Sequence, residues 1–333
     1  MNTIKKIKSA TSILIAFAFI MIISSCLKDD EPVILPEHSG DAQLSSINIG
    51  EDYSREVYYD LETKDTLGNN FKDWDLAFEC GSTGSHVWIN GGKASFAAQT
   101  NSTNMVTVTD TAQCEWKFDA SSWHPDSTAI GNWQSATGNR VYIIDRGYEY
   151  SDPDRFWKII FNEVNSTSYA FSYCRLSDTN VVSKSIFKSS NHSYIFFTFD
   201  NNGTTLNLEP EKTKWDILFT RYRYIYYDFI PPLPYYVNGV LLNPYLTMAA
   251  TDSVTDYNAI DYNFAKLLAL STKRDAIGFD WKYYSFSTTH YNVKPNFIYI
   301  IKDQKGYYYK LHFLDFYDAQ GHKGVPKFEY QRL

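Results

Sequence analysis

Short segments rich in tyrosine, isoleucine, phenylalanine and valine recur along the chain, and each is bounded by glycine, asparagine or aspartate. The clearest of these segments lie at 140–144, 156–161, 194–199 and 307–313. Such runs are typical of antiparallel strands, because aromatic and β-branched side chains suit a pleated surface and the flanking residues suit turns. One stretch, 257–270, has helical spacing, since Ile260, Phe264, Leu267 and Leu268 recur three or four positions apart. The pattern predicts an all-β protein with one short helix in its second half.

The chain repeats itself with an offset near 150 residues. The sequence WDLAF returns as WDILF, and four further pairs of motifs follow in the same order. The matched pairs are 74–78 with 215–219, 87–91 with 236–240, 129–133 with 276–281, 141–144 with 298–301, and 156–161 with 308–313. Five matches in register indicate a tandem duplication. We therefore predict two antiparallel β domains, at 45–187 and 190–333, with the short helix in the second.

The repeated Trp-Asp motif has a strand-like alternation. In a strand, alternation places Trp74, Leu76 and Phe78 on one face of the sheet and Asp75 with Ala77 on the other, and the second copy repeats this pattern. We expect both aspartates to be structural and to accept hydrogen bonds from neighbouring loop amides.

The N-terminus has the features of an export signal. Three lysines precede an apolar run at 13–23, whose eleven residues are too few to cross a bilayer of about 30 Å as a helix. The run ends in Ser24-Ser25-Cys26, which resembles the bacterial lipobox. We expect a lipoprotein signal peptide over 1–25 and a lipid anchor on Cys26.

The segment after Cys26 indicates where the lipoprotein is sent. The residues KDDE at 28–31 are similar to the signal that exports lipoproteins of Bacteroidetes-type bacteria to the outer face of the outer membrane. Proline, serine and glycine then make 26–45 a flexible tether. The predicted location is the outer membrane, with a lipid anchor and exposure at the cell surface.

Charge and cysteine content narrow the function. The formal net charge is −7, and removal of the lysine-rich leader makes it more negative, so nucleic acid is excluded as a partner. Beyond Cys26, the widely spaced Cys80, Cys114 and Cys174 support neither a disulfide framework nor a metal cluster. A single bridge, such as one from Cys80 to Cys114, stays open.

No motif of an enzyme is present. The sequence lacks GxSxG, HExxH, P-loop and GxGxxG patterns, so we assign no catalytic residue and predict that the protein is not an enzyme. Paired carboxylates that meet only in the folded chain leave a glycosidase open.

The second copy resembles the HmuY-like family of haem-binding lipoproteins. The resemblance rests on HSYIFFTFD (192–200), KWDILFTRY (214–222), YYVNGVLLN (235–243), AIGFDWKYY (276–284) and the strand pair at 307–330. The first copy carries weaker counterparts of these motifs. The resemblance implies an all-β protein of iron acquisition that takes haem from host haem-carrying proteins and passes it to a TonB-dependent receptor.

The resemblance also implies axial ligands, which are histidine in some family members and methionine in others. One ligand-bearing stretch corresponds to 251–275, which contains neither residue type, and the other corresponds to the loop that holds His290. We expect His290 to be one axial ligand of haem iron. Met248, a tyrosine or water is the candidate for the second, and no other metal site is expected.

Charged and aromatic residues nearby complete the predicted cleft. Lys294 and Arg274 are expected near the haem propionates, and Tyr224 and Tyr226 are expected to flank the ring. The alternative is a glycan- or protein-binding surface module without haem, in which His290 is an ordinary loop histidine and the tyrosines cover a sheet.

Overall fold

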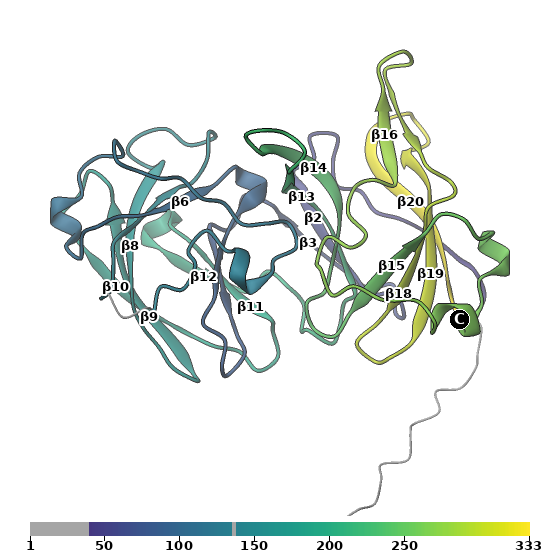
Figure 1. Ribbon diagram of the computed structural model, residues 1–333, viewed down its shortest axis with the longest axis horizontal. Coiled ribbons are helices and arrows are strands. Elements are labelled where there is room, and N and C mark those ends of the chain that lie inside the picture. The colour runs from purple at the N-terminus through teal and green to yellow at the C-terminus, as the bar shows by residue number, and fades with distance from the viewer. Residues whose placement is uncertain (1–39, 135–137) are drawn as a thin grey trace, which may run out of the picture. The chain divides into compact units, whose positions relative to one another are not determined.

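The computed structural model describes residues 40–134 and 138–333, which fold into antiparallel sheets (Figure 1). The all-β prediction is confirmed. The predicted signal peptide, Cys26 and most of the predicted tether lie outside the described residues.

Two sheets are built from the middle of the chain. The five-stranded sheet has the order β10 (Val182–Phe187), β9 (Ser168–Arg175), β8 (Phe156–Val164), β7 (Tyr142–Asp145) and β6 (Phe96–Gln99). The four-stranded sheet has the order β12 (Thr204–Leu206), β11 (Tyr194–Thr198), β4 (Leu76–Glu79) and β5 (Val87–Ile89). Their facing side chains form one core, which includes Phe78, Ile144, Phe171 and Phe197.

Two further sheets combine both ends of the chain. The five-stranded sheet has the order β1 (Gln43–Ser46), β20 (Lys323–Arg332), β19 (Tyr308–Tyr317), β18 (Ile298–Lys302) and β15 (Met248–Asp252). The four-stranded sheet has the order β14 (Leu233–Leu242), β13 (Ile217–Tyr226), β2 (Arg55–Tyr59) and β3 (Thr66–Asn70). A separate hairpin joins β16 (Lys282–Ser285) to β17 (His290–Val293). The core of this pair of sheets includes Phe219, Ile301, Phe313 and Phe328.

Helical segments are short. The 3₁₀ turns are η1 (Gly91–Lys93), η2 (Met105–Thr107), η3 (Pro125–Ser127), η4 (Asp200–Asn202) and η5 (Tyr257–Ala259). The helix predicted at 257–270 is confirmed only as α2 (Tyr262–Ala265), which Asp261 caps by accepting a hydrogen bond from the Phe264 amide. The prediction overshot at its C-terminal end, because Leu267 is exposed and does not belong to a buried face.

The two sequence copies exchange their first hairpins. Strand β2, from the first copy, pairs with β13 of the second copy, and β11, from the second copy, pairs with β4 of the first. Figure 1 shows β2 and β3 beside β13 and β14. Each core therefore contains side chains from both sides of the predicted junction at 187–190. Whether 45–187 and 190–333 fold separately stays a prediction, and the strand exchange argues against it.

Equivalent contacts recur in the two copies. Tyr142 and Ile144 occupy the first core as Tyr299 and Ile301 occupy the second. The Asn90 side-chain amide donates to the carbonyls of Phe71 and Trp74, and the Asn243 amide donates to those of Lys212 and Trp215. Asn243 is thus the counterpart of Asn90, so the sequence match of 87–91 with 236–240 was out of register.

The predicted faces of the Trp-Asp motif were wrong for the tryptophans. Leu76 packs into the first core, but Trp74 packs with Ala77 and Trp88 on the opposite face. Trp215 likewise lies apart from its second-copy core. Strands β4 and β13 begin only after the Asp residue, so the strand alternation does not extend back to the tryptophan.

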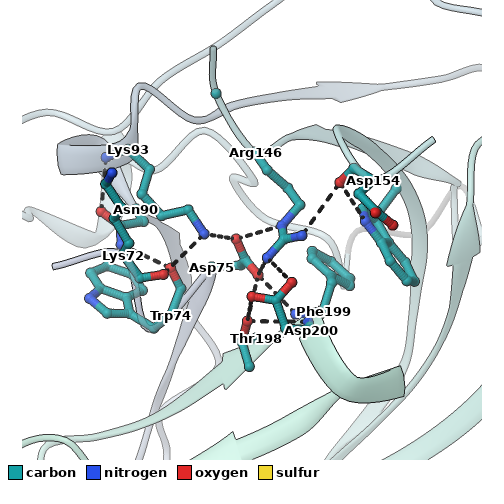
Figure 2. A network of polar contacts seen from close by, with 12 residues as sticks. Lys72, Trp74, Asp75, Asn90, Lys93, Arg146, Asp154, Thr198, Phe199 and Asp200 are labelled. Carbon is teal, nitrogen blue, oxygen red and sulfur yellow. Dashed lines mark hydrogen bonds and ion pairs between the residues drawn. The ribbon is translucent and has the colours of Figure 1, made fainter. Parts of the chain in front are cut away.

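The motif aspartate of the first copy is the centre of a buried network (Figure 2). The Asp75 carboxylate contacts Lys93 Nζ, and it accepts hydrogen bonds from Arg146 Nε at 3.0 Å and from the Phe199 amide at 2.8 Å. Burial alone raises the pKa of Asp75, but Lys93 and Arg146 together outweigh burial and hold this pKa below its ordinary value. The expected acceptor role for a loop amide is confirmed.

The motif aspartate of the second copy has no such cations. Asp216 Oδ2 accepts a hydrogen bond from the Leu61 amide at 2.7 Å, which again confirms the acceptor role, while Oδ1 is buried without a partner among the described residues. Burial raises the pKa of Asp216 to about 8, so the group is mostly neutral at pH 7. Duplicated positions therefore carry different charges.

The three described cysteines are free thiols. Cys80 belongs to the first core, whereas Cys114 packs beside Cys174 in a separate cluster. The bridge from Cys80 to Cys114 that the sequence left open is not formed, because the two residues pack in different clusters.

Candidate functional site

The hairpin of β16 and β17 extends away from the sheets at the upper edge of Figure 1. Ser285 pairs with His290, and Tyr284 pairs with Tyr291. The base of the hairpin is fixed by Lys282, whose Nζ donates to the Asn238 carbonyl and lies 4.1 Å from the Trp281 ring centroid. Burial lowers the pKa of Lys282 to about 7. The base is therefore packed, while the tip is open to solvent.

His290 is held in one tautomer. Its Nδ1 lies 2.7 Å from the Thr288 carbonyl oxygen, and a carbonyl oxygen only accepts, so Nδ1 carries the hydrogen in the neutral ring. The lone pair is then on Nε2, which is the arrangement found in metal-binding histidines whose other nitrogen donates to a carbonyl. The ring is exposed and lies 5.4 Å from the Tyr317 ring.

Aromatic side chains surround this histidine along the hairpin. The Tyr284 ring lies 5.3 Å from Phe286 and 5.1 Å from Tyr291. Phe286 is 88% exposed, which is unusual for a large apolar side chain. The Tyr317 hydroxyl accepts a hydrogen bond from the Tyr291 amide at 2.7 Å and so ties the hairpin to the end of β19.

A second set of aromatic residues lies at the open end of β13 and β14. Tyr224 lies 5.0 Å from Phe279, and Tyr226 lies 6.1 Å from Phe229 and 6.2 Å from Tyr235. Burial raises the pKa of Tyr224 and of Tyr226. Both tyrosines are thus neutral hydroxyls at pH 7, with ring faces available for stacking.

The two sets are close to each other. Burial raises the pKa of Tyr291 in the β16–β17 hairpin, and the nearby Tyr235 of β14 raises it further. We call the combined set the aromatic surface. It consists of Tyr224, Tyr226, Phe229, Tyr235, Phe279, Tyr284, Phe286, His290, Tyr291 and Tyr317.

Met248 lies far from His290. It is the first residue of β15 and pairs with Lys302, which pairs with Tyr308 at the start of β19. His290 packs beside Tyr317, nine residues further along the same strand. At about 3.3 Å per residue this separation is roughly 30 Å, so the two side chains cannot ligate one iron. The structure does not bring the two predicted ligands together.

The two predicted cationic contacts also separate from the tip of the hairpin. Lys294 lies just past the base end of β17, where its amide donates to the Trp281 carbonyl and its Nζ lies 4.6 Å from the Phe297 ring. Arg274 is buried, donates from Nε to the Leu242 carbonyl at 3.1 Å, and stacks 4.1 Å from Trp123. Tyr224 and Tyr226, by contrast, do belong to the aromatic surface.

Sequence reasoning missed most members of the aromatic surface. Tyr235, Tyr284 and Tyr317 come from three separate segments, and only the folded chain brings them together. One signal was available, because Phe286 lies beside Ser285 and Ser287 in a polar loop where a buried role is unlikely to be met. In residues 40–134 and 138–333, no group of three or more His, Cys, Asp and Glu side chains is arranged to hold a metal ion.

The sequence matches the family described as HmuY protein over residues 52–330. The chain belongs to the HmuY protein family. This single match runs through both sequence copies, so one family unit corresponds to the pair of copies rather than to each copy alone. Membership indicates a binding protein rather than an enzyme.

Solved structures from this family resemble the HmuY-family chain weakly. Apo PinO from Porphyromonas gingivitis has 11% identity and a TM-score of 0.34, and the match covers 88% of this chain and 98% of that chain. A candidate HmuY_like heme binding protein from Bacteroides vulgatus has 13% identity and a TM-score of 0.21, with 89% and 96% covered. The apo HmuY analog from Tannerella forsythia has 11% identity and a TM-score of 0.20, with 88% and 97% covered.

These TM-scores are too low to support an argument about the site. No curated protein matches the sequence. Among the described residues, no helix is both long and apolar enough to span a membrane.

Proposed function

We propose that this HmuY-family protein is a cell-envelope lipoprotein that binds haem on the aromatic surface. Haem is a flat, largely apolar ring with an iron that accepts an imidazole nitrogen and two propionates that prefer water. An exposed set of stacked tyrosine and phenylalanine rings offers the faces, and a solvent-facing edge suits the propionates.

The observation that carries this proposal is the state of His290. The hydrogen bond from Nδ1 to the Thr288 carbonyl leaves Nε2 as the lone-pair nitrogen, and the ring is exposed among aromatic side chains. In contrast, the nitrogen that His86 and His322 direct inward contacts a carboxylate. His290 is therefore the histidine best prepared to ligate iron on this surface.

The second axial position falls to water or to a tyrosine of the aromatic surface. Met248 is too distant, as its position at the far end of β19 requires. Because no cation was found beside the tip of the hairpin, we place the propionates in solvent rather than on Lys294 or Arg274.

We further propose that the protein is anchored through Cys26 in the outer membrane, faces the cell surface, and passes haem to a TonB-dependent receptor. The support for this part is the sequence of the N-terminus and the family membership. A ligand held on an open surface by one protein side chain suits transfer to a partner, because few contacts must be broken.

A glycan is the competing ligand, since exposed tyrosines also stack on sugar rings. A hemin titration separates the two. We expect the purified protein to give a saturable Soret band with a stoichiometry of one haem per chain. If no saturable band develops, and a glycan array yields a specific ligand, the haem proposal is refuted.

A further inference from the structure

A second, polar cavity lies beside β2 and β13. Its walls come from these strands, from β14, and from the loops at 90–92 and 119–123, with Arg274 at one side. The space open to the centres of water molecules is about 40 Å³. One water needs about 10–15 Å³ by this measure, so the cavity has room for about three water molecules or a ligand of similar size. No member of the aromatic surface lines it.

Arg223 is the exceptional side chain in this cavity. It is 2% exposed, and its Nε, Nη1 and Nη2 have no hydrogen-bond partner among the described residues. The guanidinium lies between aromatic rings, 4.3 Å from the Phe96 centroid and 5.4 Å from the Phe118 centroid. A buried guanidinium without an acceptor is strongly unfavourable, so these three donors require an acceptor that the described chain does not supply.

The nearest carboxylate does not satisfy Arg223. Asp119 forms no ion pair with it within 4.0 Å in the described part of the chain, although the two groups influence each other. Both Asp119 oxygens are already occupied, because Oδ2 accepts from the Ile89 amide at 2.7 Å and Oδ1 from the Ala129 amide at 2.6 Å. Asp119 is therefore a structural acceptor for two loops.

The remaining polar groups favour an anion. Glu56 Oε1 and the Tyr222 hydroxyl line the cavity without partners among the described residues. Burial raises the pKa of Glu56 to about 8, so at neutral pH this carboxyl is mostly uncharged and acts as a donor. The guanidinium groups of Arg223 and Arg274 then face a cavity with Asp119 as the opposing charge, and Arg221 lies at its wall.

We propose that this cavity is a binding site for a small monocarboxylate, held by the guanidinium fork of Arg223. A carboxylate is planar and presents two oxygens at the spacing of two guanidinium N–H groups, which gives paired, charge-assisted hydrogen bonds. The volume restricts the ligand to about the size of formate or acetate. This inference is independent of the haem proposal, because the two sites share no residue.

Calorimetric titration of the purified protein with sodium formate and sodium acetate tests the proposal. The titrations are run at pH 6.5 against sodium chloride at the same ionic strength. We expect saturable binding of one carboxylate per chain and a rise in the midpoint of thermal unfolding that chloride does not produce. Absence of a carboxylate-specific response in the unmodified protein overturns the proposal.

Variants locate the site. Arg223→Met should weaken binding at least tenfold, whereas Arg175→Met, which removes a surface guanidinium paired with Asp154, should leave binding unchanged. Equal losses in both variants refute the assignment to Arg223.

Glu56→Gln gives a test that does not depend on the folding of the Arg223 variant. The unmodified protein should bind the carboxylate more weakly at pH 9 than at pH 6.5, because ionised Glu56 adds a negative charge to the cavity. Glu56→Gln should bind equally at both pH values. If Glu56→Gln loses affinity at pH 9 as the unmodified protein does, the anion does not lie beside Glu56 and the site is wrong.

Discussion

Substituting the two duplicated motif aspartates by asparagine should have opposite consequences. At Asp75 every neighbour is a donor, namely Lys93 Nζ, Arg146, the Thr198 hydroxyl and the Phe199 amide. Asparagine keeps the shape, but it removes the negative charge and turns an NH₂ group toward these donors. Two buried cations then lose their compensating charge.

The expected cost follows from the burial of this network. Removing one partner of a buried ion pair costs about 3–5 kcal/mol. Arg146 keeps a second contact, because its Nη2 lies 2.8 Å from the half-exposed Asp200. We therefore expect Asp75→Asn to lose about 3 kcal/mol of unfolding free energy, at the lower end of the range.

Asp216→Asn should behave differently. The pKa of Asp216 is raised to about 8 by burial, so asparagine replaces a group that is mostly neutral at pH 7 and still accepts from the Leu61 amide. We expect a loss below about 1 kcal/mol at pH 7. Between pH 5 and 8 this variant should gain relative to the unmodified protein, because only the unmodified chain favours ionisation in the unfolded state.

Urea unfolding at pH 7, followed by tryptophan fluorescence, gives both free energies. The eight tryptophans report on both pairs of sheets. The reasoning is refuted if the two variants are destabilised equally, or if Asp216→Asn is the weaker protein.

Three further predictions address the pH dependence, the sheets and the anchor. Burial raises the pKa of four acids, to about 8 for Glu56 and Asp216 and about 7 for Asp119 and Glu209. Each binds its proton more tightly when folded, so the stability that they contribute falls as pH rises from about 4 to 8, and the thermal midpoint should be lower at pH 8.5 than at pH 5.5; a higher midpoint at pH 8.5 contradicts this. Residues 71–209 contain both sheets of the first core without interruption, so this fragment should unfold cooperatively by circular dichroism while 45–187 should not, and the reverse result excludes the strand exchange. Cys26→Ala should abolish metabolic labelling with palmitate, and equal labelling of mutant and unmodified protein disproves the lipid anchor.

The strands and the repeat were predictable because they depend on local patterns. The alternation within 141–144 fixes which side chains of β7 enter the core, and the equivalent residues of β18 follow the same rule. The exchange of hairpins was not predictable, because β2 and β11 have similar patterns and either could pair with either Trp-Asp strand. The choice is made by contacts between residues far apart in the chain, such as the Leu61 amide with Asp216.

The candidate site was predictable only in part, for the same reason. His290 is recognisable from its loop, but the hydrogen bond to Thr288 that prepares Nε2 depends on the turn geometry at the hairpin tip. Met248 was chosen by its residue type, and only the register of β15, β18 and β19 shows that it lies at the wrong end of the sheet. The unpaired guanidinium of Arg223 lies within an aromatic run that the sequence presents as an ordinary strand.

The visible spectrum of the hemin complex, compared between His290→Ala and His124→Ala, tests the proposed haem ligation most directly. His124 is the matched control, because it is also exposed but lies beside η3, outside the aromatic surface. Ligation through His290 predicts that His290→Ala shifts the Soret band and weakens hemin binding at least tenfold, while His124→Ala matches the unmodified protein. An unchanged Soret position and affinity in His290→Ala would contradict the account.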